Sequence, residues 1–306
     1  ARKNRMLLSV KGGGHNSAGT AACDDGLMID LSAMRRVTVD RHKNTARVDG
    51  GALLSDLDSE TQLYGLAVSA GIVSHTGVGG LALGGGFGWI SRKHGLSVDN
   101  LKSAEVVTAD GRVVTASAEE NADLFWGLRG GGGNFGIVSS FEFACAEIGT
   151  DVFSGLIVKK FEDAAKYMQF HREYVRDLPD DMTAWMVIRK APPLPFLPEN
   201  IHGRMVVVVP FVWLGEKERG ESLVKPLREI TPSHGEAIGL NPWLNWQAGF
   251  DALVTHGARN YWKSHHLKDL SDGCIDRILE FAAKMPSDEC EVFIPHMEGA
   301  PSRVGE

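Results

Sequence analysis

The stretch Val10-Lys11-Gly12-Gly13-Gly14-His15-Asn16 places three consecutive glycines directly after an apolar run. A tight turn rarely needs so many glycines. Successive bare amides in such a turn instead form a nest that binds an anion, typically a phosphate. His15 follows this nest, and a histidine beside glycines is, taken alone, most often a hydrogen-bonding loop residue. The stretch therefore predicts a phosphate-binding turn and leaves the role of its histidine open.

Glycine is concentrated in the first half of the chain, where residues 1–150 hold 25 of the 36 glycines. They gather in a first (residues 12–14), a second (77–88) and a third (130–136) glycine cluster. Glycine inside a helix or strand costs about 0.5–1 kcal/mol relative to alanine, so this concentration indicates left-handed backbone or close approach to a ligand. Three such loops suit an extended cofactor held at several points, and tight turns alone are the plainer alternative.

Two strings share the spacing of a dinucleotide-binding motif, Gly77-x-Gly79-x-x-Ala82 and Gly131-x-Gly133-x-x-Gly136. That motif requires a preceding strand and a helix that opens within it, so that phosphate meets the helix N-terminus. Gly84, Gly85, Gly86 and Gly88 would interrupt the first helix, and the second string is expected between a helix and a strand, the reverse order. The sequence therefore disfavours a nicotinamide-dependent Rossmann enzyme, and it contains no Walker P-loop string.

The pattern of apolar residues predicts two regions that meet near Gly149. In the first region we expect strands over 6–10, 26–31, 45–48 and 137–143, a hairpin over 101–115, and helices over 53–64 and 122–128. In the second we expect helices over 162–178, 216–227 and 272–284, and strands over 182–189, 205–213 and 261–267. Helices packed on one antiparallel sheet fit this second pattern.

Composition narrows the class of protein. The net charge of −7 and the lack of clustered Lys and Arg argue against a nucleic-acid partner, and no apolar run reaches the roughly 20 residues that a membrane helix needs. The four cysteines match no zinc or disulfide spacing. We therefore expect unpaired thiols and no bound metal, and unpaired thiols favour a cytoplasmic location. His265 and His266 would face opposite sides of a strand and share no metal.

The glycine motifs resemble those of the covalent FAD-linked oxidases, the berberine-bridge-enzyme-like group within the vanillyl-alcohol-oxidase superfamily. Residues 10–16 are similar to that family's Arg-(Ser/Gly)-Gly-Gly-His motif, residues 71–100 to its second signature, and residues 126–138 to its third. The resemblance covers essentially all of residues 1–145 and is looser after 150. It implies an α+β fold with a PCMH-type FAD-binding domain over 1–148, and a substrate domain with an antiparallel sheet covered by helices over 149–306.

The resemblance also assigns roles to residues. It implies that His15 is bonded to the 8α position of FAD, and that Lys11 keeps the charge of the family's usual Arg. Plant members add a second bond from a cysteine, but Val73 stands at that position, so one covalent bond is expected. The expected FAD contacts are Lys11, Gly12, Gly13, Gly14, His15, Asn16, Val73, Ser74, Thr76, Gly77, Gly79, Gly80, Gly85, Gly88, Gly136, Ile137 and Val138. Tyr261 and Lys263 are weaker candidates for substrate contacts.

The implied function is that of an FAD-dependent oxidoreductase. A hydride from a C–H bond of an alcohol, sugar or amine-like small molecule passes to the flavin, and dioxygen is the expected acceptor, giving hydrogen peroxide. A flavin dehydrogenase with another acceptor and a non-catalytic FAD-binding fragment are the alternatives. The family has a further small subdomain before the position of Ala1 and continues past that of Glu306, so we expect truncation at both ends, and no catalytic base is assignable.

Overall fold

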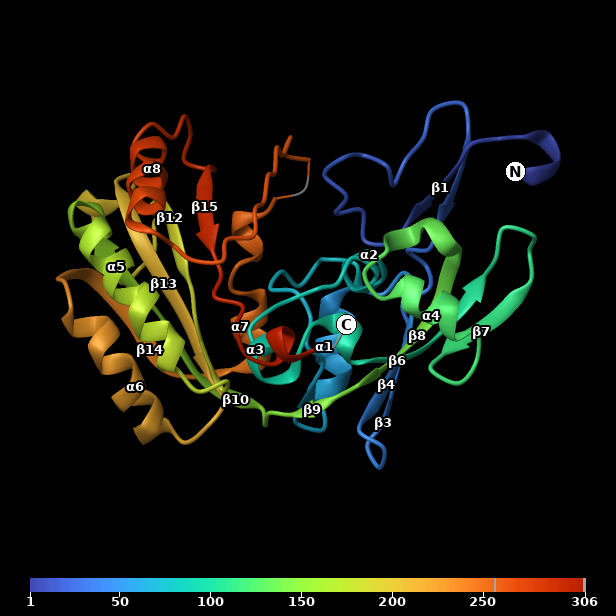
Figure 1. The fold of residues 1–306 in the computed structure, drawn as a ribbon, viewed down its shortest axis with the longest axis horizontal. Helices are drawn as coiled ribbons and strands as arrows, with labels where there is room; N and C mark the ends of the chain where they lie inside the picture. Colours follow the sequence, from blue (N-terminus) through green and yellow to red (C-terminus); the bar gives the residue numbers. More distant parts are fainter. Residues whose placement is uncertain (256, 305–306) are drawn as a thin grey trace. The chain divides into compact units, whose positions relative to one another are not determined.

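The computed structural model describes residues 1–255 and 257–304, which pack as two compact units (Figure 1). The first unit is Ala1–Thr150 with Pro242–Trp262, and the second is Asp151–Asn241 with Lys263–Glu306. The chain leaves the first unit close to the expected boundary at 148. The second unit differs from the expected continuous range 149–306, because residues 242–262 pack with the first unit.

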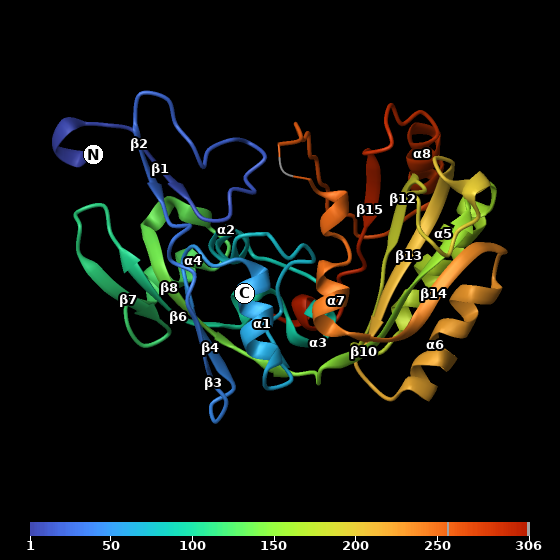
Figure 2. The same cartoon turned by 180° about the vertical axis from the view of Figure 1, so that it is seen from behind.

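A five-stranded antiparallel sheet forms the core of the first unit (Figure 2). Its order is β3 (Val37–Asp40), β4 (Thr45–Asp49), β8 (Ile137–Ala144), β6 (Leu101–Val107) and β7 (Val113–Ser117). Alternate side chains of these strands are fully buried, for example Val48, Val106 and Phe141, as the two-residue period of a strand requires. The predicted hairpin is confirmed, with Gly111 at its turn at a φ of +86°.

Two helices of the first unit that are far apart in sequence lie against each other, α1 (Leu54–Gln62) and α7 (Trp243–Ala248). Asp58 of α1 is buried and accepts hydrogen bonds from Trp243 Nε1 at 3.3 Å and Gln247 Nε2 at 3.1 Å. Burial raises the pKa of this carboxyl to about 6, although both hydrogen bonds oppose the shift. A buried polar contact therefore connects the N-terminal part of this unit to the returning segment.

Shorter elements complete the first unit and carry the glycine clusters. They are the parallel pair β1 (Leu8–Lys11) and β2 (Leu27–Asp30), the antiparallel pair β5 (Leu66–Ala67) and β9 (Ala146–Glu147), the helices α2 (Val78–Leu83), α3 (Ser91–His94) and α4 (Ala122–Leu128), and the 3-10 turns η1 (Arg2–Asn4), η2 (Ser97–Asp99), η3 (Gly132–Phe135) and η7 (Asp251–Leu253). A short helix, α2, does open within the string 77–82, where the sequence argument expected the following glycines to break a helix, and it has only six residues because Gly84 ends it.

The second unit is built on one six-stranded sheet. Five of its strands lie in the order β14 (Ser233–Pro242), β10 (Asp151–Lys160), β13 (Met205–Trp213), β12 (Met186–Lys190) and β15 (Glu291–Ile294). The strand β13 also pairs with β11 (Met182–Ala184), and its pairings with β10, β11 and β12 are antiparallel. Figure 1 shows α5 (Ala164–Tyr174), α6 (Lys217–Glu229) and α8 (Asp272–Ala282) on one face, where they bury an apolar core. The α+β class, with helices covering an antiparallel sheet, is confirmed.

Lys159 is fully buried beneath the end of α6. Its Nζ donates hydrogen bonds to the carbonyl oxygens of Arg228, at 2.8 Å, and Thr231, at 2.7 Å. Burial lowers the pKa of this amine to about 8. The last carbonyls of a helix have no partner within it, so the lysine satisfies polar groups that the core would otherwise leave unpaired.

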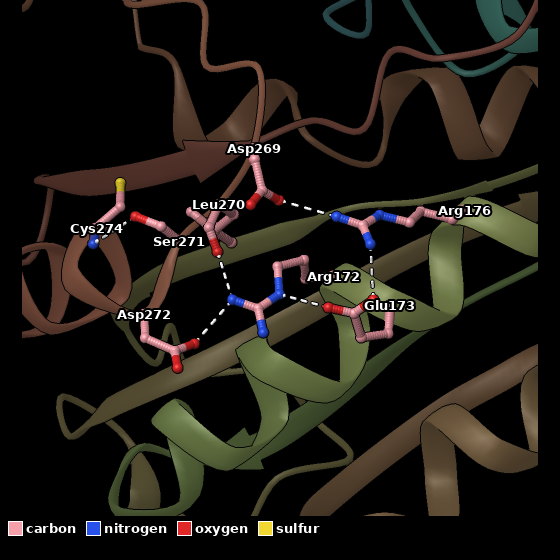
Figure 3. A network of polar contacts seen from close by, with 8 residues as sticks. All are labelled: Arg172, Glu173, Arg176, Asp269, Leu270, Ser271, Asp272 and Cys274. Atoms are coloured by element: carbon pink, nitrogen blue, oxygen red, sulfur yellow. Dashed lines mark hydrogen bonds and ion pairs between the residues drawn. The ribbon is translucent and has the colours of Figure 1, made fainter.

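Figure 3 shows a charged network that ties α5 to the start of α8. Arg172 donates to the carbonyl of Leu270 and to Asp272, at 2.9 and 2.8 Å. Arg176 bonds Asp269 at 3.0 Å, and the hydroxyl of Ser271 accepts from the backbone N–H of Cys274, capping α8. These contacts fix the angle at which the chain enters the helix.

Several expected elements differ from the structure. The strand predicted over 261–267 is wrong, since this exposed segment is irregular and pairs with no strand. The strands β10, β14 and β15 were not expected. The three predicted helices of the second unit are confirmed to within a few residues, counting the 3-10 turns at the ends of α5. All four cysteines are free, as expected.

Candidate functional site

The first and second glycine clusters pack backbone against backbone. A Cβ added to Gly13 would lie 2.3 Å from the nitrogen and 2.5 Å from the Cα of Gly77, and one added to Gly77 would lie 2.3 Å from the nitrogen of Gly13. Real Cβ atoms do not approach other atoms so closely. Only glycine fits at either position, and the two loops are thereby held side by side.

Gly50, a residue that the sequence did not single out, lies between the first two clusters and β8, the strand that follows the third cluster. The backbone N–H of Gly50 donates to the carbonyl of Ser139 at 2.8 Å, and a Cβ there would lie 2.2 Å from the carbonyl oxygen of Val138. Across the same glycine, a Cβ on Gly79 would lie 2.9 Å from the Gly50 oxygen, and one on Gly12 would lie 3.5 Å from it. Since η3 of the third cluster also contacts α2 of the second, the three clusters lie near one another within the first unit.

The later part of the second cluster is fixed by hydrogen bonds. Ser97 and Val98 donate their backbone N–H groups to the carbonyls of Gly86 and Gly85, at 2.8 and 3.1 Å. Arg129, next to the third cluster, donates from Nε to the carbonyl of Val98 at 2.9 Å. The glycine loops are thus connected to one another and held at several points.

Some glycines of these loops are explained neither by packing nor by backbone conformation. A Cβ on Gly80 or Gly133 would meet no atom within 4 Å, and neither residue has a positive φ. Gly85 also faces open space, but its φ of +115° requires glycine. When a ligand lies close against the backbone, glycine is required even at positions where the protein itself has room for a side chain. The clusters therefore fit an elongated cofactor.

His15 lies directly beside a second histidine, His75. Its Nε2 is 2.8 Å from Nδ1 of His75, and the two ring centroids are 4.8 Å apart. The other ring nitrogen, Nδ1, lies 3.5 Å from the hydroxyl of Thr76, which is long for a hydrogen bond. The two histidines are 60 positions apart in the sequence, His15 directly after the first glycine cluster and His75 two positions before the second.

The segment that carries His75 is held from the other side by Asp251. One carboxylate oxygen accepts the backbone N–H of Ser74 at 2.8 Å, and the other accepts its hydroxyl. His75 and Asp251 are absent from the expected site residues. The second histidine directly after Ser74 was a signal, but nothing in the sequence indicates that a residue near 250 returns to this loop.

The remaining expected site residues are placed as follows. The backbone N–H of Ser32 holds the pKa of the Asp30 carboxyl at about 2, together with Lys11, which forms an ion pair with this carboxyl at 2.9 Å. The Asn16 side chain accepts the backbone N–H of Thr20. Gly88 packs against the carbonyl of Ala70, and Gly136 packs against β6. Val73 begins the turn that ends at Thr76. Ile137 is half-buried at the start of β8.

The two substrate candidates lie in the irregular segment that follows α7. Tyr261 is 86% exposed and precedes Trp262, the last residue of the first unit, and Lys263 begins the later segment of the second unit. Their assignment to the substrate stays a prediction. Within residues 1–255 and 257–304, no group of three or more His, Cys, Asp or Glu side chains has the arrangement of a metal site, and no helix has the length and apolar character needed to cross a membrane.

Comparison with known proteins supplies independent evidence. Residues 1–117 match the model of a family described as an FAD binding domain. An FAD-linked oxidoreductase of Dictyostelium discoideum is 30% identical over 302 residues, an alignment that covers 98% of this chain and 63% of the relative. The chain therefore spans less than two thirds of that protein.

Two solved oxidase structures resemble the chain in three dimensions. The 6-hydroxy-D-nicotine oxidase of Arthrobacter nicotinovorans has a TM-score of 0.81 at 26% identity, covering 99% of this chain and 67% of the other. The glucooligosaccharide oxidase of Acremonium strictum has a TM-score of 0.80 at 25% identity, covering 99% and 66%. The second is described as carrying a 6-S-cysteinyl, 8α-N1-histidyl FAD.

Proposed function

Because this chain belongs to the FAD-linked oxidases of the berberine-bridge-enzyme-like group, we propose that it holds FAD covalently through His15. We propose further that the flavin accepts a hydride from a small-molecule substrate and passes its electrons to dioxygen. The observation that carries the proposal is the packing of the glycine clusters against one another, with His15 directly after the first and beside the start of the second.

The glycine clusters would hold the cofactor mainly through their backbone. Bare amides of the turn at 12–14 suit the negatively charged pyrophosphate. The contact between Gly13 and Gly77 fixes that turn against the second cluster before any ligand binds. Gly80 and Gly133 leave room along the loops for a flat or extended ligand. A preorganised backbone of this kind lowers the entropy lost on binding.

The single covalent bond follows from the side chains at two positions. His15 immediately follows the phosphate-binding turn, and its imidazole carries the nitrogen that would bond the 8α carbon. The glucooligosaccharide oxidase structure is described with both a cysteinyl and a histidyl bond. Here Val73 stands where the second bond would require a cysteine. One flavin bond per chain is therefore proposed.

The bound flavin supplies the redox chemistry, accepting two electrons and a proton as hydride from a substrate C–H bond. Alcohols, sugars and amines are the proposed substrate classes, because the similar structures are by name a 6-hydroxy-D-nicotine oxidase and a glucooligosaccharide oxidase. The chain's own contribution is to bind and orient the cofactor. Tyr261 and Lys263 are proposed to contact the substrate, and no residue of the chain is proposed as the base.

The covalent bond is tested by denaturing the full-length protein and viewing the band for flavin fluorescence, with His15→Ala prepared in parallel. The wild-type band is expected to fluoresce and the His15→Ala band to be dark. His42→Ala, which removes an exposed histidine of the same unit, is the matched control and keeps its fluorescence. A dark wild-type band from protein that was yellow before denaturation contradicts the covalent bond.

The redox function is tested by adding candidate alcohols, sugars and amines to the same yellow protein. Bleaching of the flavin followed by peroxide release in air supports an oxidase. Bleaching with reoxidation only by an artificial acceptor favours a dehydrogenase. If dithionite bleaches the flavin but no substrate of these classes does, the proposed turnover is contradicted. FAD binding alone is then left as the function.

A further inference from the structure

We propose that His75 is a positioning residue that sets the proton of His15 for attachment of the flavin and accepts that proton when the bond forms. The proposal rests on the covalent FAD proposed above and adds a residue to it. Its basis is the 2.8 Å contact between Nε2 of His15 and Nδ1 of His75.

The direction of this hydrogen bond determines which nitrogen of His15 reacts, and the proposal takes Nδ1 of His75 as the acceptor. A neutral imidazole carries one N–H and one lone pair, and its partner determines which nitrogen holds the proton. With Nδ1 of His75 as the acceptor, the proton of His15 stays on Nε2. The lone pair is then on Nδ1, the nitrogen that lies beside Thr76. The geometry thus assigns Nδ1 as the atom that bonds FAD.

The attachment reaction needs a proton acceptor at the opposite nitrogen. One C–H bond of the 8α methyl group breaks and its proton passes to the flavin ring, while a bond forms between that carbon and Nδ1 of His15. The electron pair of the new bond comes from Nδ1, and two electrons remain in the ring, which is left reduced. His15 becomes positively charged until His75 takes the Nε2 proton. Dioxygen then accepts the two electrons together with two protons, giving hydrogen peroxide and an oxidised, histidyl-bonded flavin.

The structure holds His75 in place independently of any cofactor. On one side Asp251 accepts two hydrogen bonds from the preceding residue, Ser74. On the other side Gly77 packs against Gly13, two residues before His15. Both histidines therefore lie on backbone that is fixed within the first unit, which is what a group that orients another requires.

The test measures how fast flavin-free full-length protein becomes covalently labelled after FAD is added in air. Samples are quenched in denaturant, and the bonded flavin is followed by band fluorescence and by intact mass. Reversible FAD binding is measured separately, without oxygen, from the quenching of free FAD fluorescence. The variants are His75→Ala, His75→Gln and the control His42→Ala.

His75→Ala is expected to slow attachment about 100-fold, the usual size of an acid–base contribution, with reversible FAD binding within twofold of wild type. Added imidazole should restore part of the rate. His75→Gln can accept the hydrogen bond but cannot take the proton. It should therefore attach slowly, and its rate should lack the rise with pH that a histidine acting as the proton acceptor gives wild type.

The outcomes separate this inference from the proposed function. Wild-type protein that binds FAD but never bonds it overturns the covalent function and the inference with it. Wild type that bonds FAD while His75→Ala does so equally fast overturns the inference alone. If His75→Ala fails to fold, the pH profile of His75→Gln decides, and a profile that matches wild type overturns the role of His75.

Discussion

Gly13 and Gly77 are in such close contact that neither has room for a methyl group, since a Cβ on either would stand 2.3 Å from a backbone nitrogen of the other. The contact joins the histidine-bearing turn to the second glycine cluster. Neither residue has a positive φ. Glycine is therefore required here by proximity of the two loops, and substitution tests the proximity directly.

We expect Gly13→Ala to destabilise the protein by about 3 kcal/mol, because overpacking displaces the backbone of one loop, and to abolish covalent FAD. Urea unfolding and band fluorescence measure the two effects. Gly273→Ala is the control, since its Cβ would meet nothing within 4 Å and lies in α8. Equal unfolding midpoints for Gly13→Ala and Gly273→Ala would contradict the packing of the two loops.

Asp58 makes stability depend on pH. Its pKa is raised from an ordinary 3.8 to about 6 in the folded protein, so the folded state binds the proton more tightly than the unfolded chain does. Stability therefore falls as the pH rises from about 4 to about 6, by about 3 kcal/mol in total.

The measurement is the urea midpoint from pH 4 to pH 7 for wild type and Asp58→Asn, since asparagine cannot ionise. The fall in stability between pH 4 and pH 7 should be smaller in the variant by the amount that Asp58 contributes. Glu60→Gln, on the exposed side of the same helix, should keep the wild-type slope. A slope for Asp58→Asn equal to that of wild type would show that this carboxyl has the same pKa in the folded and unfolded states.

Lys159 supports the end of α6 through two carbonyl oxygens. Lys159→Met keeps the length of the side chain but leaves both buried oxygens without their donor, so we expect a loss of about 2 kcal/mol. Lys160→Met, which changes the neighbouring and more exposed lysine, should have an effect near zero. Hydrogen exchange in α6 localises the loss, and unchanged exchange there would exclude this role for Lys159.

Local signals in the sequence were sufficient for the loops that form the site. The glycine clusters and His15 were identified because runs of glycine have few structural explanations, and the predicted helices 53–64 and 122–128 correspond to α1 and α4. The resemblance of these motifs to a flavoprotein family agrees with the family match to residues 1–117.

Contacts between distant residues could not be read in the same way. His75 acquires its significance only through the approach of His15, and Asp251 through the return of residues 242–262. The strand β10 contains Gly155 and a buried Lys159, so its alternation is irregular, and β14 contains two glycines. The segment 261–267 showed the opposite error, because its aromatic residues suggested a strand where no neighbouring strand offers hydrogen bonds.

The contact between Asp58 and the pair Trp243 and Gln247 also constrains the order of events during synthesis. When residues 1–150 leave the ribosome, the partners of this carboxyl have not yet been translated, and all of residues 151–241 must be made first. Nascent chains usually fold domain by domain from the N-terminus. Here the first unit stays unfinished until α7 emerges, so the N-terminal half depends on the translation of the C-terminal half.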